Sequence, residues 1–278
     1  MLKGINLWTM STNPWDMGRS VPRDIRQCLD MAKDAGFDGV ELVKGLHREI
    51  SNNSTKKDIL EVKQYADDIG IEIFSLVSQE NMDCFISSKN KEKAMLAKED
   101  IINNIDIASI LGVRQILVLP VSVDEDNDYI QSHLRGIEQL KELADYAKEK
   151  DVTIGIENIP NKALLSPFEM KWFIESVGST SIGCYLDLGN CAIWSNPIHW
   201  IYALREKIIA VHVKDYNYDT KRHCDLYSGN IDFNSCIKAL KDIGYDKWVT
   251  AEISPPYNNH PELTTFVTAM SMKKMIDS

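Results

Sequence analysis

The stretch TIGIENI (residues 153–159) decides how the rest of the chain is interpreted. It is short and rich in isoleucine, as a strand of a helix-covered parallel sheet is, yet it carries Glu157 near its end. Three later runs have the same form, with one acidic or imidazole side chain each: GCYLDLG (183–189), IIAVHVK (208–214) and WVTAEIS (248–254). We therefore expect four parallel strands that end in polar residues.

Four similar runs precede these: GINLW (4–8), GVELV (39–43), EIFSLVS (72–78) and QILVLPV (115–121). Each gap between successive runs is long enough for one crossover helix, and no linker or low-complexity tract interrupts the series. Repeated βα units predict an α/β fold, a single (β/α)8 TIM barrel, with residues 1–278 as one domain. A doubly wound open sheet is the alternative. It usually has a glycine-rich turn after its first strand, and GINLWTMSTNP has none.

Residue patterns also predict where the helices begin and end. Proline favours the first helical turn, and glycine commonly follows the last. The expected helices run from Pro22 to Gly36, from Lys56 to Gly70, over 89–111 before Gly112, over 130–150, and from a cap at Asp232 to Gly244.

The overall charge and the cysteines exclude several classes of protein. The net charge of −10 and the pI of about 5.1 come without a basic stripe, so we expect no nucleic-acid partner. The six cysteines form no CxxC pair, which is typical of reduced thiols in the cytoplasm. No stretch approaches the roughly 20 apolar residues of a membrane span, so we expect no membrane partner. The oligomeric state stays open, a homo-oligomer included.

Four residues carry the predicted chemistry: Glu157, Asp187, His212 and Glu252. A single charged residue in an apolar strand is accounted for by a helix cap or an ion pair. Four on successive strands converge on the mouth of a barrel, where carboxylates repel one another unless a cation lies between them. Three oxygen ligands and one nitrogen ligand favour one divalent metal ion, Mn²⁺, Mg²⁺ or Co²⁺, and are also compatible with Zn²⁺.

A set of motifs resembles the sugar phosphate isomerase/epimerase family of the xylose isomerase-like TIM barrels. The resemblance runs in order along nearly the whole chain. The motifs are GFDGVEL (36–42), GIEN (155–158), YLDLGN (185–190), HVKD (212–215), GNIDF (229–233) and ALKDIGYDKWVTAE (239–252).

The resemblance implies a site and a reaction on a small carbohydrate. In that family the glutamate, aspartate, histidine and glutamate that match Glu157, Asp187, His212 and Glu252 bind one divalent metal. Relatives that epimerise ketoses use the two glutamates to move a proton on opposite faces of the sugar, through a metal-stabilised enediolate. The chain departs from the enzymes of free ketoses at three substrate contacts, where it has Asn190, Ala163 and Tyr218.

Other residues are expected near the substrate. Asn190 is a substrate-contact candidate because it stands where the ketose enzymes have a histidine. Lys214 faces the same way as His212, so it is a candidate cation or proton donor. Glu41 faces inward as a substrate contact or as a structural ion pair. Trp8 forms a wall against a sugar or packs in the core. We interpret the basic run 221–223 as solvated.

Three other functions compete with the sugar isomerase or epimerase. A nuclease of the endonuclease IV type needs further histidines, where this chain has Ser78–Gln79, Pro120–Val121 and Asn190. A dehydratase of an inosose- or dehydroshikimate-like substrate uses the same metal ligands, and Lys214 suits its leaving hydroxyl. A non-catalytic sugar-binding protein would not need to keep all four ligands.

Overall fold

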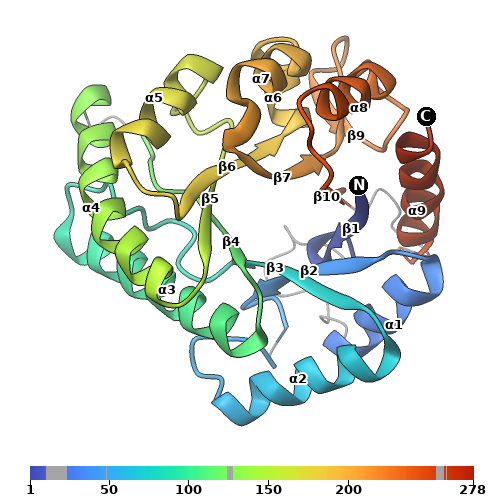
Figure 1. Cartoon of the computed structure of the whole chain (residues 1–278), viewed down its shortest axis with the longest axis horizontal. Coiled ribbons are helices and arrows are strands. Elements are labelled where there is room, and N and C mark those ends of the chain that lie inside the picture. The colour runs from blue at the N-terminus through green and yellow to red at the C-terminus, as the bar shows by residue number, and fades with distance from the viewer. Residues whose placement is uncertain (11–23, 48, 124–127, 255–259, 261) are drawn as a thin grey trace.

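The computed structural model describes the chain apart from residues 11–23, 48, 124–127, 255–259 and 261. Its parallel strands close into a barrel in the order β1-β10-β7-β6-β5-β4-β3-β2 (Figure 1). The predicted (β/α)8 barrel is therefore confirmed. The barrel strands are β1 (Leu2–Asn6), β2 (Gly39–Lys44), β3 (Glu72–Ser78), β4 (Gln115–Val118), β5 (Thr153–Glu157), β6 (Ile182–Asp187), β7 (Ile208–Val213) and β10 (Trp248–Ala251).

Helices surround the barrel on its outer side (Figure 1). They are α1 (Ile25–Ala35), α2 (Lys56–Ile69), α3 (Lys91–Leu111), α4 (Tyr129–Glu149), α5 (Pro167–Val177), α6 (Leu188–Trp194), α7 (Pro197–Leu204), α8 (Phe233–Asp242) and α9 (Leu263–Ile276). The predicted ends at Gly36, Gly70 and Gly112 and the cap at Asp232 are confirmed. Pro22 lies outside the described residues. Over the ranges described, no helix combines the length and the apolar composition that crossing a bilayer requires.

An aromatic pair fills the barrel interior at the end opposite the candidate site. The rings of Phe74 and Trp248 stack with their centroids 4.0 Å apart. Gly4 leaves room for them, because a Cβ there would lie 2.6 Å from the Phe74 ring. The interior is thus packed at this end, and the polar side chains gather toward the other.

Two expectations about the ends of strands were wrong in detail. Trp8 lies in a 3-10 helix, Leu7–Met10, and not in β1. Glu252 lies one residue beyond β10, although its N–H still donates to the Val213 carbonyl at 3.1 Å. The apolar pattern continues past the strand ends, because residues beyond them, such as Ile253, are buried in the core. The pattern therefore predicts strands that are too long.

The long stretch after β7 is partly regular. It contains an antiparallel hairpin of β8 (Asp215–Asn217) and β9 (Arg222–Cys224). Buried Asp215 holds the chain beyond the hairpin, because its carboxylate accepts from the N–H groups of Gly229 and Ile231. The hairpin therefore stands at the same rim of the barrel as the strand ends.

Candidate metal centre

Four ligand atoms meet at the carboxyl ends of the strands. They belong to Glu157, Asp187, His212 and Glu252, and all lie within 4.8 Å of one another. Register brings two of them together directly, since Asp187 and His212 are partners across β6 and β7. The side chains of Asp187 and His212 are fully buried, while that of Glu252 is 16% exposed. The cluster thus has a buried base and one side open to the cavity.

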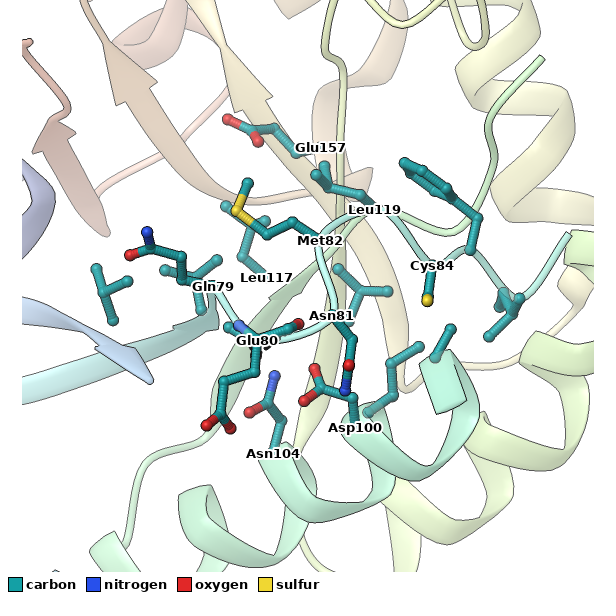
Figure 2. A pocket seen from close by; sticks show the side chains of 18 of the residues that line it. Gln79, Glu80, Asn81, Met82, Cys84, Asp100, Asn104, Leu117, Leu119 and Glu157 are labelled. Atoms are coloured by element: carbon teal, nitrogen blue, oxygen red, sulfur yellow. Dashed lines mark hydrogen bonds between the residues drawn. The ribbon is translucent and has the colours of Figure 1, made fainter. Parts of the chain in front are cut away.

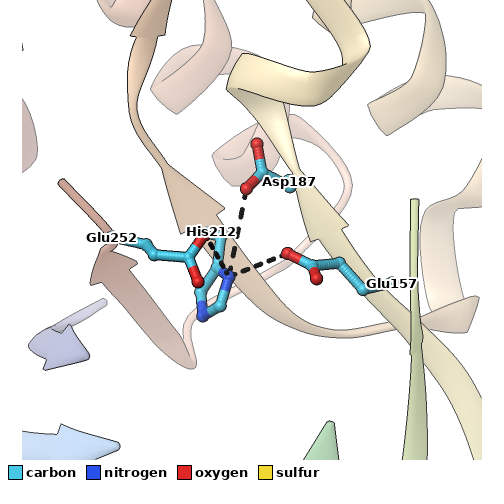
Figure 3. Close-up of side chains that lie close together, drawn as sticks. All are labelled: Glu157, Asp187, His212 and Glu252. Carbon is cyan, nitrogen blue, oxygen red and sulfur yellow. Dashed lines mark hydrogen bonds and ion pairs between the residues drawn. The ribbon is translucent and has the colours of Figure 1, made fainter. Parts of the chain in front are cut away.

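The imidazole of His212 stands at the middle of the cluster (Figure 3). Its Nδ1 lies 3.0 Å from Glu157 Oε1, 3.7 Å from Glu252 Oε2 and 3.9 Å from Asp187 Oδ2. Figure 3 shows the two glutamates approaching from opposite sides of the ring. Three carboxylates and an imidazole nitrogen in so small a volume form a donor set that fits one divalent cation.

Glu41 lies beneath His212 and fixes its orientation. Its Oε1 is 2.7 Å from His212 Nε2, and its carboxylate also accepts from Asn6, Ser75 and Tyr185 at 2.6–2.7 Å. An acceptor held this firmly accepts a hydrogen bond from Nε2–H, while Nδ1 faces the three carboxylates. Glu41 is fully buried and is not among the residues lining the cavities described below, which favours the ion-pair alternative over a substrate contact.

The buried charges change one another's protonation. Burial, together with nearby Glu252, raises the pKa of Glu157 to about 7 despite the His212 hydrogen bond. Burial alone would raise the pKa of Glu252 as well, but the Lys214 and His212 charges lower it below its usual value. Burial opposes charge on His212, yet the carboxylates of Glu41 and Glu252 raise the imidazole pKa well above its usual value. The two glutamates therefore hold their protons with different strength.

Lys214 lies against the cluster, on the same side as His212. Its ammonium is 2.7 Å from Asp187 Oδ2 and 2.5 Å from Glu252 Oε2. Gly189 permits this approach, because a Cβ there would lie 2.4 Å from Lys214 Cγ. Although burial opposes its charge, the neighbouring carboxylates raise the pKa of Lys214, so it stands as a cation at the edge of the site.

Two asparagines hold the Asp187 backbone and carboxylate. The Asn190 N–H donates to Asp187 Oδ1 at 2.7 Å, and the Asn190 amide donates to the Asn158 carbonyl at 2.9 Å. Asn158 in turn bonds both main-chain groups of Asp187, at 2.9 and 3.0 Å. Sequence reasoning missed Asn158, and the available signal was its place directly after Glu157 in the GIEN motif.

A cavity of about 630 Å³ opens above the cluster. This volume falls in the range typical of small-molecule sites. Of the residues predicted from the sequence, five line it: Trp8, Glu157, Asn190, Lys214 and Glu252.

Comparison with known proteins assigns the fold to a family. The family model described as xylose isomerase-like TIM barrel matches residues 29–272. The chain belongs to this family. The resemblance inferred from the motifs is thereby confirmed.

Relatives in the xylose isomerase-like family include sugar epimerases. L-ribulose-5-phosphate 3-epimerase UlaE of Salmonella heidelberg is 25% identical over 220 residues, covering 78% of each chain. A D-tagatose 3-epimerase-like protein matches with a TM-score of 0.81 and 22% identity, over 100% of this chain and 98% of the other. The IOLI protein, solved with a bound zinc atom, matches with a TM-score of 0.82 and 18% identity, over 100% and 98%. Likeness at this identity establishes the shared barrel.

His223 is exposed, as expected of the solvated run 221–223, and it also lines the cavity. His223 pairs with Tyr216 across the hairpin, and their rings meet edge to face at 5.4 Å. Partial enclosure by the cavity wall and the nearby Lys214 charge lower the pKa of its imidazole. Its neighbours Lys221 and Arg222 are exposed, as expected of a solvated run. The hairpin, which sequence reasoning missed, is what brings His223 to the cavity wall.

Proposed function

We propose that the protein is a divalent-metal-dependent isomerase or epimerase of a sugar or sugar phosphate. The observation that carries this proposal is the meeting of Glu157, Asp187, His212 and Glu252 at the base of a cavity that can hold a monosaccharide. Curated relatives named as sugar epimerases add support at the level of the reaction class.

We assign proton transfer to the two glutamates. Glu157 comes from β5 and Glu252 from the end of β10, so they reach a bound sugar from opposite sides. One carboxylate removes the proton from the carbon next to a carbonyl, and the electron pair moves into an enediolate. The other returns a proton on the opposite face, which inverts that carbon.

The remaining groups position the substrate and its charge. Asp187 and His212 would hold the metal together with the glutamates, and the ion would supply Lewis-acid polarisation of the substrate oxygens. Lys214 presents its ammonium to the same side of the cavity and stabilises negative charge on an oxygen. Trp8 and Asn190 form the walls.

The position of Lys214 favours a second candidate, a dehydratase. The same α-proton abstraction leads to loss of water when a cation stands beside the departing hydroxyl, and Lys214 lies 2.5 Å from Glu252 in the cavity wall. The two reactions differ in product: an epimerase gives an isomer, whereas a dehydratase gives an enol or alkene.

Incubation in D₂O tests both candidates. Protein loaded with Mn²⁺, Mg²⁺ or Co²⁺ is given ketoses, ketose phosphates and inososes, and products are analysed by NMR. We expect deuterium at a carbon next to the carbonyl, together with an epimer or isomer. A dehydrated product would favour the lyase. Metal binding without exchange or product from any sugar would contradict both reactions and favour a binding protein.

A further inference from the structure

A second, smaller cavity adjoins the metal centre beneath the loop between β3 and α3. It has a volume of about 90 Å³, room for several water molecules. It shares five lining residues with the main cavity: Trp8, Met82, Leu119, Glu157 and Glu252. We call it the side pocket; Figure 2 shows its lining, with Glu157 at one end and α3 at the other.

Two buried carbonyl oxygens in the side pocket lack a donor. Asn104, on α3, is only 2% exposed, and its Oδ1 has no hydrogen-bond partner. The Oε1 of Gln79, just beyond β3, is likewise buried and unpartnered. Figure 2 shows the two side chains coming from the helix side and the strand side of the pocket. Buried acceptors are costly to leave unpaired, so this wall suits a ligand that brings hydroxyl donors.

The charges around the side pocket oppose an anion. Glu80 and Asp100 line it, and the described lining contains no lysine, arginine or histidine. The nearby cation, Lys44, is fully buried and already held by Asp100 at 2.8 Å and by Asn52 at 2.7 Å. A phosphate or carboxylate entering here would meet carboxylates without a free counter-charge.

Apolar side chains complete the walls. Val43, Val77, Ile86 and Leu117 line the same space. Such walls fit the C–H faces of a carbohydrate, while the amides fit its hydroxyls. We propose that the side pocket binds the uncharged, hydroxyl-bearing end of the substrate, away from the reacting carbon. This assignment rests on the proposed function for the identity of the substrate, and it concerns that one end only.

Binding of hexitols tests the assignment without requiring turnover. The probes are D-mannitol, D-sorbitol and galactitol, which have no carbonyl, compared with four-carbon erythritol and with mannitol 1,6-bisphosphate. Affinities are measured by calorimetry on Mn²⁺-loaded protein. We expect at least one hexitol to bind about tenfold more tightly than erythritol. The bisphosphate, charged at both ends, should bind more weakly than that hexitol.

Two single variants test whether the tighter binding of a hexitol than of erythritol comes from the side pocket. Asn104→Leu and Gln79→Leu keep approximate size but remove the amide. Each should weaken hexitol binding about two- to tenfold, the range of one hydrogen bond, and leave erythritol binding unchanged. Asn234→Leu is the matched control, because Asn234 is exposed on α8. Two single variants are used so that one failure to fold does not end the test.

Three results would contradict the assignment of the side pocket. They are that no hexitol binds, that both variants bind hexitols as the wild type does, or that the bisphosphate binds more tightly in a way that depends on Asn104. Failure of the proposed reaction is distinguishable, because it is detected by the absence of deuterium exchange from ketoses. Hexitol binding that depends on Asn104, without such exchange, would keep the side pocket and reject the reaction.

Discussion

The two halves of the barrel divide the work of the site. Strands β5, β6, β7 and β10 each place one candidate ligand at or just beyond their carboxyl ends. Strands β1 to β3 contribute Asn6, Glu41 and Ser75, of which Glu41 holds His212 in place. Asn6 and Ser75 hold the Glu41 carboxylate, together with Tyr185 of β6. Glu41 is the third residue of β2, whereas Glu157 is the last of β5. The depth of a carboxylate in the barrel, and not its presence on a strand, decides whether it faces the cavity or supports a ligand.

Substitution in the ligand half should have the largest effect on turnover. Glu157→Gln and Glu252→Gln keep the side-chain shape but remove a base. Positioned acid and base groups contribute about 10²–10⁴-fold, so we expect kcat to fall by at least that factor in either variant. The measurement is turnover of the sugar found in D₂O, with metal content determined on the same samples.

Isotope exchange distinguishes loss of a base from loss of metal. A variant that keeps one glutamate should still exchange solvent deuterium from one epimer of the substrate. Full turnover in both variants with metal bound would reduce the glutamates to ligands and reject the two-base mechanism.

Substitution in the supporting half should have a smaller effect, seen in metal affinity. Glu41→Gln weakens the acceptor for His212 Nε2 and frees the ring to change orientation. Loss of such a supporting partner typically costs about 10–100-fold in metal affinity or activity, so we expect a Kd for Mn²⁺ about tenfold higher or more. Glu61→Gln, at an exposed position of α2, is the control. Equal affinity in both variants would show that Glu41 does not orient the ligand.

The protonation of the ligand half should make metal binding depend on pH. In the metal-free protein the pKa of Glu157 is about 7, against an ordinary 4.5. The contribution of this raised pKa to the free energy of unfolding is therefore fully present below pH 4.5 and is lost as the pH rises through about 7. The raised pKa of His212 acts in the same direction at higher pH. A metal must displace these protons, so its affinity should rise with pH, about tenfold per unit for each proton displaced.

Thermal unfolding with and without Mn²⁺ measures this dependence. The metal-induced increase in Tm should be larger at pH 8 than at pH 5.5. An increase that is the same at both values would mean that Glu157 and His212 are already deprotonated in the metal-free protein.

The smallest expected effect is on DNA. The net charge of −10, and the absence of histidine at Ser78–Gln79, Pro120–Val121 and Asn190, predict no nicking of a duplex with an abasic site at physiological salt. Metal-dependent nicking that disappears in Glu157→Gln would place the protein among the nucleases.

The sequence predicts the ligand half better than the supporting half. Glu157, Asp187, His212 and Glu252 are visible because a charged residue near the end of an apolar run is costly to bury unless a partner or an ion compensates it. The barrel follows from the regular alternation of these runs with helical patterns.

Other features depend on contacts between distant segments. The depth of Glu41 depends on the register of β2 against β1 and β3, which alternation along one strand does not specify. The place of His223 depends on a short hairpin whose strands have three residues each. The side pocket requires Asn104 and Gln79 to meet beneath a loop, so no local pattern predicts it.

The most direct test of the account is the metal content of the purified protein. After reconstitution with Mn²⁺, Mg²⁺, Co²⁺ or Zn²⁺ and removal of free ion, elemental analysis should find about one divalent ion per chain. Asp187→Asn and His212→Ala, folded as judged by circular dichroism, should lose it. If the wild type retains none of the four metals, or if both variants retain as much as the wild type, the four side chains do not form a metal centre.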